Sequence, residues 1–156
     1  MSHENTNWGQ SVAGVLIRDN KVLLARHTYG KGKGLLIIPG GYVNVGETPQ
    51  DAVKREFLEE TGVEVVPGNI IGIRFNMHDW YVVFRVDYVS GTAVSDHEVN
   101  SEVLWVDVQE ALLRDDVPEL SKSLIRSASV SVEGLKPVGY AGNENYNPSS
   151  LYCEWF

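Results

Sequence analysis

The segment GYVNVGETPQDAVKREFLEETGV, residues 41–63, carries the strongest structural signal in this chain. Thr48 supplies a capping hydroxyl, and Pro49 suits the first position of a helix. Asp51 adds an early negative charge that favours the helix dipole. Gly62 provides the left-handed residue at which many helices end. The segment therefore predicts a helix between Thr48 and Gly62, preceded by a loop.

Acidic side chains gather on one side of this predicted helix. Three of them fall within an arc of about 100° in helical projection: Glu56, Glu59 and Glu60. That arc borders the face marked by Ala52, Val53 and Phe57, which we expect to turn inward. Carboxylates at this spacing repel one another, and desolvation raises the cost. Since a hard cation such as Mg²⁺ or Mn²⁺ prefers oxygen ligands, the pattern predicts a divalent-metal site.

The same segment resembles the Nudix signature. That signature reads Gly, five residues, Glu, seven residues, Arg-Glu, a bulky aliphatic, any residue, Glu-Glu, any residue, Gly and a bulky aliphatic. The matching positions are Gly41, Glu47, Arg55, Glu56, Phe57, Glu59, Glu60, Gly62 and Val63. Phe57 is the one departure, an aromatic residue where an aliphatic one is usual. We expect it to alter packing rather than metal binding.

The resemblance implies an α/β fold, a Nudix-type α/β/α sandwich around a mixed β-sheet. It also implies roles for particular residues. The implied metal ligands are Glu56, Glu59, Glu60 and the carbonyl of Gly40. Arg55 would form an ion pair that orients a neighbouring glutamate, with Glu59 the favoured partner. Glu47 would support the loop and the helix from behind the ligands, as outer partners of metal ligands commonly do.

The resemblance further implies a metal-dependent hydrolase that cleaves a phosphoanhydride bond. The favoured substrate is a nucleoside diphosphate linked to another moiety, such as ADP-ribose or a sugar nucleotide. A (d)NTP pyrophosphohydrolase is one alternative, and a non-catalytic nucleotide-binding regulatory module is another. A prenyl diphosphate isomerase would need a cysteine in the core, and Cys153 is poorly placed for that role.

The general base has several candidates. The family draws it from the box or from a downstream loop, and this chain offers Glu98 and Glu102 downstream. We favour Glu98, because it is expected in the loop while Glu102 adjoins a strand. A solvated acidic loop without a catalytic role is an equally open interpretation.

Substrate contacts must come largely from outside the helix. Arg26 ends a strand and would meet a phosphate or form a surface ion pair. Gly40 and Gly41 would lie beside the substrate. Four aromatic residues are candidates for stacking on a base: Trp80, Tyr81, Phe75 and Tyr42, with Trp80 favoured. Packing in the core is the common alternative for aromatics in strands.

The flanking sequence predicts the remaining elements from periodicity and turn residues. These are a hairpin of strands 11–17 and 21–27, a short strand 35–38, a hairpin of strands 70–76 and 80–89, a strand 103–106, and helices 107–113 and 118–128. The cationic loop 29–34 lacks the ending of a Walker-type phosphate loop. It is interpreted as an exposed loop or as a phosphate-steering one.

Length and composition are consistent with one domain over residues 1–156. With 156 residues, the chain is too short for two comfortable domains, and its formal charge of −8 disfavours nucleic acid or an anionic membrane as a partner. A single cysteine and the lack of a signal-like start favour the cytoplasm. The aromatic-rich tail, 129–156, either packs on its own domain, closes as a lid or forms a homodimer contact.

Overall fold

A computed structural model describes residues 9–130, 133–139 and 150–154. The strands are β1 (Gly9–Arg18), β2 (Lys21–His27), β3 (Leu36–Ile37), β4 (Gly40–Tyr42), β5 (Glu64–Phe75), β6 (Asp79–Ser90), β7 (Asn100–Asp107), β8 (Lys136–Val138) and β9 (Leu151–Cys153). The helices are α1 (Pro49–Thr61), α2 (Val108–Leu113) and α3 (Glu119–Val130). None of the helices in these described stretches is long and apolar enough to cross a membrane.

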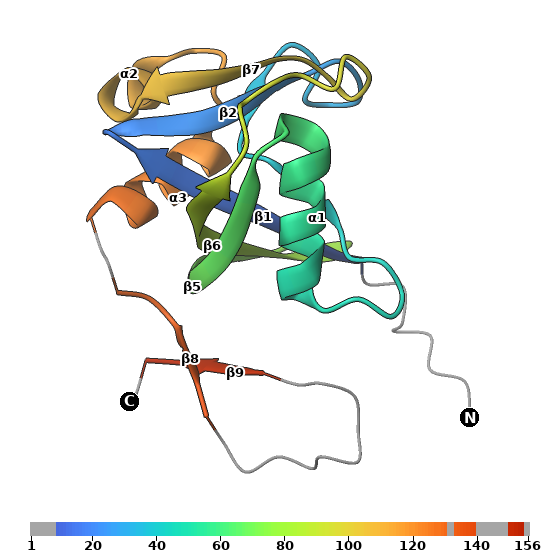
Figure 1. Ribbon diagram of the computed structural model, residues 1–156, viewed down its shortest axis with the longest axis vertical. Helices are drawn as coiled ribbons and strands as arrows, with labels where there is room; N and C mark the ends of the chain where they lie inside the picture. Colours follow the sequence, from blue (N-terminus) through green and yellow to red (C-terminus); the bar gives the residue numbers. More distant parts are fainter. Residues whose placement is uncertain (1–8, 131–132, 140–149, 155–156) are drawn as a thin grey trace.

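The main sheet is mixed and lies between helices (Figure 1). Its order is β3-β2-β1-β6-β5, with β4 also paired to β1 and β7 to β2. One core cluster joins α1 to the sheet, and the other joins α2 and α3 to it. The parallel pairing of β1 with β6, beside antiparallel neighbours, makes the sheet mixed. The predicted α/β/α sandwich is confirmed.

Helix α1 begins and ends where its capping residues predict. The Thr48 side chain accepts a hydrogen bond from the backbone N–H of Asp51. Gly62 lies in the left-handed region at φ 74°, and its N–H donates to the carbonyl of Leu58. Phe57, the departure from the signature, is fully buried among apolar neighbours. Its larger ring is therefore absorbed by the core between α1 and the sheet.

The predicted hairpin of the first two strands is only partly correct. Asp19 and Asn20 both have positive φ, as a tight two-residue turn requires. However, β1 pairs with β2 only near that turn, through Ile17–Val22 and Arg18–Lys21. Beyond it, β1 pairs with β4 and β6, while β2 pairs with β3 and β7. The two strands therefore diverge into separate halves of the sheet.

The other elements match their predictions with shifted bounds. β5 begins at Glu64 rather than at residue 70, because register shifts around Pro67 accommodate residues that normally interrupt a strand. β7 is longer than expected, and α3 continues to Val130. The side chain of Asp107 caps α2 by accepting from two backbone N–H groups. Leu124 and Ile125 form the buried face of α3, whereas Leu120 is exposed.

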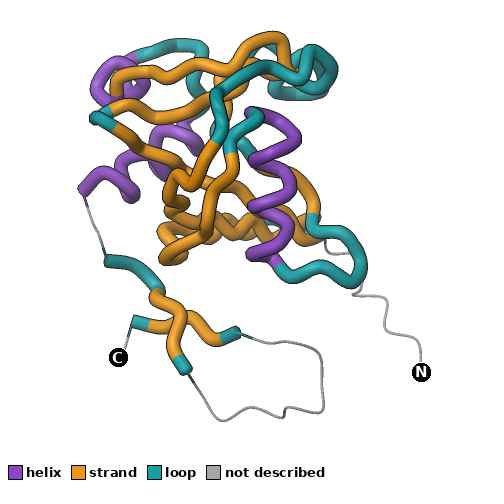
Figure 2. Tube along the Cα trace, in the orientation of Figure 1, coloured by secondary structure: helices purple, strands orange, loops and turns teal. Residues whose placement is uncertain are grey.

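The described part of the tail packs on the domain. β8 and β9 form a separate two-stranded sheet, seen below the main sheet in Figure 2. Leu135 exchanges backbone hydrogen bonds with Ile70 of β5. The Tyr152 ring meets Phe84 edge to face at 5.8 Å, and its hydroxyl accepts a hydrogen bond from Gln50 of α1. The remaining tail aromatics lie outside the described residues: Tyr140, Tyr146, Trp155 and Phe156.

Candidate active site

Two glycines bring α1 close to strand β4. The backbone N–H of Gly40 donates to the Glu60 carboxylate at 3.1 Å. A Cβ on Gly40 would lie 2.1 Å from the carbonyl oxygen of Val12, and a Cβ on Gly41 would lie 2.5 Å from the Glu56 carboxyl carbon. Neither position has room for a side chain. Gly40 therefore lets β4 lie close against β1, and Gly41 leaves the space that the Glu56 carboxylate occupies.

Glu60 and Glu56 occupy the inward position predicted for them. Glu60 is only 5% exposed, and burial, followed by the charge of Glu56, raises its pKa to about 8. Burial also raises the pKa of Glu56, while Arg55 opposes that rise. The prediction was wrong for Glu59, whose side chain is 58% exposed. The helical projection gives the direction in which the Glu59 side chain leaves the helix axis. Neither the sheet nor a loop covers that part of the helix surface, so the side chain stays exposed.

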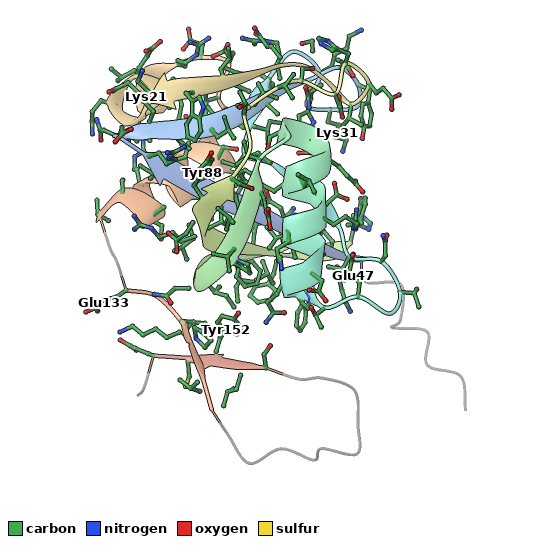
Figure 3. All side chains as sticks on the ribbon, in the orientation of Figure 1. Lys21, Lys31, Glu47, Tyr88, Glu133 and Tyr152 are labelled. Atoms are coloured by element: carbon green, nitrogen blue, oxygen red, sulfur yellow. The ribbon has the colours of Figure 1, made fainter. Side chains whose placement is uncertain are left out.

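Arg55 connects the loop before α1 to the acids. Its Nε and Nη2 donate to the two carboxylate oxygens of Glu47, each at 2.8 Å, and its Nη1 donates to Glu56 at 2.8 Å. The contact with Glu59 is longer, 3.4 Å. The expected ion pair with Glu59 is present, but the bidentate partner of Arg55 is Glu47. Arg55 lowers the pKa of Glu47 to about 2, and Figure 3 shows Glu47 on the loop that leads into α1.

The residues at this site are suited to a hard cation. Glu56 and Glu60 offer oxygen atoms that a hard cation prefers. Burial raises the pKa of both carboxyl groups, and the charge of Glu56 raises that of Glu60 further. Within the described ranges, no three His, Cys, Asp or Glu side chains converge as a ready metal cage. Arg55 is part of the reason that the glutamates do not converge, since it holds Glu56 and contacts Glu59. A cation bound here would compete with Arg55 for both carboxylates.

The loop between β6 and β7 is attached to the C-terminal end of α1. The Val94 N–H donates to the carbonyl of Thr61 at 2.8 Å. The Asp96 carboxylate accepts from the backbone N–H groups of Glu98, Val99 and Asn100. This turn leaves the Glu98 side chain exposed beside the end of α1 that carries Glu60. The loop that carries the predicted downstream candidate is thus attached to the helix that carries the acids.

Two residues of this loop connection were not identified from sequence. The buried Asn100 side chain donates to the Glu60 carbonyl at 2.8 Å, and the charge of Asp96 contributes to the raised pKa of Glu60. An Asp two residues before a turn is an ordinary loop signal. Nothing in the local pattern indicates that this loop contacts a helix forty residues earlier.

Arg26 is held in an ion-pair network. Its guanidinium contacts Glu102 and Asp116, and it also donates to the carbonyl of Gly34. The hydrogen bond with Glu102 raises the pKa of Arg26. Of the two interpretations made for Arg26, the ion pair is the one present. The same contact occupies Glu102, which leaves Glu98 as the downstream carboxylate without an ion pair among the described residues.

The candidate stacking aromatics divide between the two faces of the sheet. Trp80 meets Phe75 edge to face at 5.2 Å. A cavity of about 430 Å³ beside Trp80 is lined by Val12, Val43 and Pro49 among others, at the N-terminal end of α1. Tyr81, next in sequence, instead packs against the core cluster that contains α3.

Comparisons with known proteins agree with this fold and acid cluster. The model of the NUDIX domain matches residues 8–127. The chain is 33% identical over 132 residues to the NAD-capped RNA hydrolase NudC of Vibrio atlanticus, covering 76% of this chain and 47% of that protein. It is 34% identical over 87 residues to the ADP-ribose pyrophosphatase of Methanocaldococcus jannaschii, covering 52% of each. The chain thus spans about half the length of these relatives.

A solved structure shows the same fold. The NUDIX hydrolase from Nitrosomonas europaea superposes with a TM-score of 0.70 at 23% identity, covering 78% of this chain and 88% of that one. The match of the domain model covers all strands of the main sheet, β1 to β7, both α1 and α2, and α3 up to residue 127. This chain belongs to the Nudix family.

Proposed function

We propose that the protein is a metal-dependent hydrolase that cleaves the phosphoanhydride bond of a nucleoside diphosphate linked to another moiety, such as ADP-ribose or a sugar nucleotide. The observation that carries the proposal is the pair of inward carboxylates, Glu56 and Glu60, held against Gly40 and Gly41. Keeping Glu60 charged in this setting is costly, since its pKa is about 8. A divalent cation offsets that cost.

The proposed ligands are the carboxylates of Glu56, Glu59 and Glu60 with the carbonyl of Gly40. Nudix hydrolases generally need a divalent metal, and Mg²⁺ or Mn²⁺ suits these oxygen atoms. When bound, the metal neutralises the diphosphate and lowers the pKa of water. The exposed position of Glu59 suits it to a ligand on the substrate side.

Arg55 and Glu47 have positioning roles in this proposal. Their bidentate pair fixes the loop before α1, and the remaining guanidinium N–H holds Glu56. Glu47 also accepts from the backbone N–H of Asn44, which closes the loop on itself. Displacing Arg55 from Glu56 would free that carboxylate for a cation while Glu47 retains the guanidinium.

Glu98 is the proposed general base. Its carboxylate has no ion-pair partner in the described part of the chain, whereas Glu102 is held by Arg26. The Glu98 loop is attached to α1 at Thr61 and Glu60. The attachment supports a role in which Glu98 accepts a proton from the attacking water. Glu59, exposed at the same end of α1, is the rival within the box.

The substrate class is supported by the names of the relatives. One is called an ADP-ribose pyrophosphatase and the other an NAD-capped RNA hydrolase. Both names refer to a nucleotide compound. The formal charge of −8 favours a small nucleotide over a long nucleic acid in the present chain.

The test is a substrate panel with Mg²⁺: ADP-ribose, NADH, GDP-mannose, dinucleoside polyphosphates and (d)NTPs. We expect turnover of ADP-ribose or a sugar nucleotide, reduced at least a hundredfold in Glu60→Gln and about tenfold or more in Glu98→Gln. Glu119→Gln is the matched control, because Glu119 is an exposed helical glutamate whose ion pair, within the described part of the chain, is with Lys122 alone.

Each alternative gives a different result in this panel. Preferred turnover of (d)NTPs would identify a triphosphate pyrophosphohydrolase. Tight nucleotide binding without cleavage would identify a binding module and refute the proposal that the protein is a hydrolase. Undiminished turnover by Glu60→Gln and Glu59→Gln would refute the metal-ligand assignment.

A further inference from the structure

The cationic loop, residues 29–34, begins beside the loop that carries Glu98. Thr28, which precedes it, donates through its backbone N–H to the carbonyl of Val99 at 3.2 Å. The Thr28 hydroxyl donates to the carbonyls of Glu98 at 2.9 Å and Val99 at 3.0 Å. Figure 1 shows the two loops side by side, one after β2 and the other before β7. The start of the cationic loop is therefore hydrogen-bonded to the segment that carries the proposed general base.

The end of the cationic loop is fixed to the strand before it. The N–H of Gly34 donates to the carbonyl of His27 at 2.9 Å, and the Arg26 guanidinium donates to the carbonyl of Gly34 at 2.9 Å. Ion pairs with Glu102 and Asp116 hold Arg26 in place. With both of its ends anchored, the cationic loop forms a defined projection from the sheet.

Two successive turns place both lysines of the cationic loop on the outside of a bend. The Lys33 N–H donates to the carbonyl of Gly30 at 3.2 Å, and the Leu35 N–H donates to that of Gly32 at 2.9 Å. Lys31 and Lys33 are each the second residue of one of these turns, and both are exposed. Within the described stretches of the chain, neither lysine takes part in an ion pair. The loop therefore offers two unpaired positive charges to the solvent.

The cationic loop starts close to the end of α1 that carries Glu60. His27, the last residue of β2, pairs with Asn100, the first residue of β7, and the Asn100 side chain donates to the Glu60 carbonyl at 2.8 Å. Adjacent strands lie about 4.8 Å apart, so the loop begins one strand spacing from a residue that contacts α1. Figure 3 shows Lys31 and Glu47 at opposite ends of α1. The lysines thus belong to the same end of the molecule as Glu60.

The two lysines supply unpaired positive charge to this region. The guanidinium groups of Arg26 and Arg55 are both neutralised by carboxylates. Burial lowers the pKa of His27, so its imidazole is neutral near pH 7 and adds no charge. A nucleoside diphosphate is anionic, and a chain with a formal charge of −8 repels it. Lys31 and Lys33 are therefore suited to offset that repulsion beside the proposed active site.

We propose that Lys31 and Lys33 bind the phosphate groups of the nucleotide substrate and determine its affinity, while cleavage depends on the carboxylates of α1. This inference rests on the proposed function, since the anion is the diphosphate that would be cleaved. An ammonium group is a compact charge with three donors on a flexible stem, which suits phosphate oxygen atoms. The cationic loop is thus a phosphate-binding arm beside the Glu98 loop, and it favours ligands that carry more phosphate.

The test measures the binding of ADP and AMP with Mg²⁺ by isothermal titration calorimetry at low and high NaCl concentration. We expect Lys31→Gln/Lys33→Gln to bind ADP about tenfold more weakly than wild type at low salt, since local charge of one sign concentrates a ligand of the opposite sign by this order. The loss for AMP should be smaller, because AMP carries one phosphate fewer. High salt should narrow the difference, since exposed charges are screened. Lys31→Arg/Lys33→Arg, which keeps both charges, should retain the affinity.

Lys21→Gln/Lys54→Gln is the control, because it makes the same change in net charge at two other exposed lysines. Lys21 is at the opposite end of β2, and Lys54 is on the outer surface of α1. Thermal melting confirms that each variant is folded. Unchanged ADP affinity in Lys31→Gln/Lys33→Gln at low salt would overturn the proposal. An equal loss in the control would also overturn it, by assigning the effect to net charge.

Binding is measured apart from turnover so that the two proposals fail separately. With a substrate that is cleaved, KM should rise in Lys31→Gln/Lys33→Gln more than kcat falls. Cleavage of ADP-ribose by wild type, together with normal ADP binding by this variant, refutes the phosphate-binding arm and leaves the hydrolase. An ADP affinity that depends on the two lysines, without cleavage of any substrate, supports the arm and refutes the hydrolase.

Discussion

The side-chain amide of Asn100 donates a 2.8 Å hydrogen bond to the main-chain carbonyl of Glu60. Asn100 is the first residue of β7 and is only 1% exposed. Its own N–H donates to Asp96 in the loop that carries Glu98. One side chain thus connects the end of α1 to that loop. The end of α1, which carries the proposed metal ligand, is therefore joined to the loop that carries the proposed base by an amide forty residues away from Glu60 in sequence.

Replacing Asn100 with Ala should destabilise the protein by about 1–3 kcal/mol, because the buried Glu60 carbonyl loses its donor. Urea unfolding monitored by tryptophan fluorescence measures this change. We also expect kcat to fall more than KM rises, since the Glu98 loop loses its connection to α1. Gln109→Ala, an exposed amide on α2, should alter stability by less than about 0.5 kcal/mol. An unfolding curve for Asn100→Ala equal to wild type would contradict this connection.

Replacing Arg55 with Lys should lower activity about 10–100-fold, because an ammonium group cannot form the bidentate pair with Glu47. The neighbouring Lys54→Arg is the control, since Lys54 is exposed. In a double-mutant cycle with Glu47→Gln, the two effects should be strongly non-additive. Additive losses would show that the two residues act independently.

Replacing Gly41 with Ala should weaken metal binding at least tenfold while changing stability by about 1 kcal/mol or less. The new methyl group would occupy the space of the Glu56 carboxylate, which can swing away because it is the end of a flexible side chain. Mn²⁺ titration followed by electron paramagnetic resonance measures the affinity. Gly139→Ala serves as the control because a Cβ there meets nothing. Unchanged Mn²⁺ affinity in Gly41→Ala would remove Glu56 from the ligand set.

The metal-free protein should lose stability as pH rises from about 4.5 to 8. Glu60 has a folded-state pKa of about 8 against an ordinary 4.5, so the folded state binds more protons than the unfolded state within this window. The contribution is complete below pH 4.5, and its loss levels off above pH 8. The total amounts to a few kcal/mol at most.

Denaturant unfolding in EDTA at a series of pH values measures this dependence. Glu60→Gln should flatten the decline, and the difference between the two proteins isolates Glu60 from other titrating groups. Glu47 has the opposite sign but titrates near pH 2, outside this window. Added Mg²⁺ should lessen the decline by favouring the ionised carboxylate. Parallel curves for Glu60→Gln and wild type would show that Glu60 is not the source.

The local sequence was sufficient to predict the helices whose ends and buried faces depend on residues close by in the chain. Thr48 and Gly62 fixed the two ends of α1, and the spacing of Ala52 and Phe57 fixed its buried face. The cap of α2 at Asp107 followed in the same way. Capping and helical periodicity act through neighbours in the chain, so they can be deduced without knowledge of the fold.

Tertiary structure decided the features that depend on distant partners. It separated β1 from β2, left Glu59 exposed, and paired Arg55 with Glu47 and Arg26 with Glu102. It also distributed the aromatic residues between two faces. Strand order and register determine which face and which neighbours a side chain has. These long-range pairings are formed only when the whole sheet is assembled, and no local pattern in the chain encodes them.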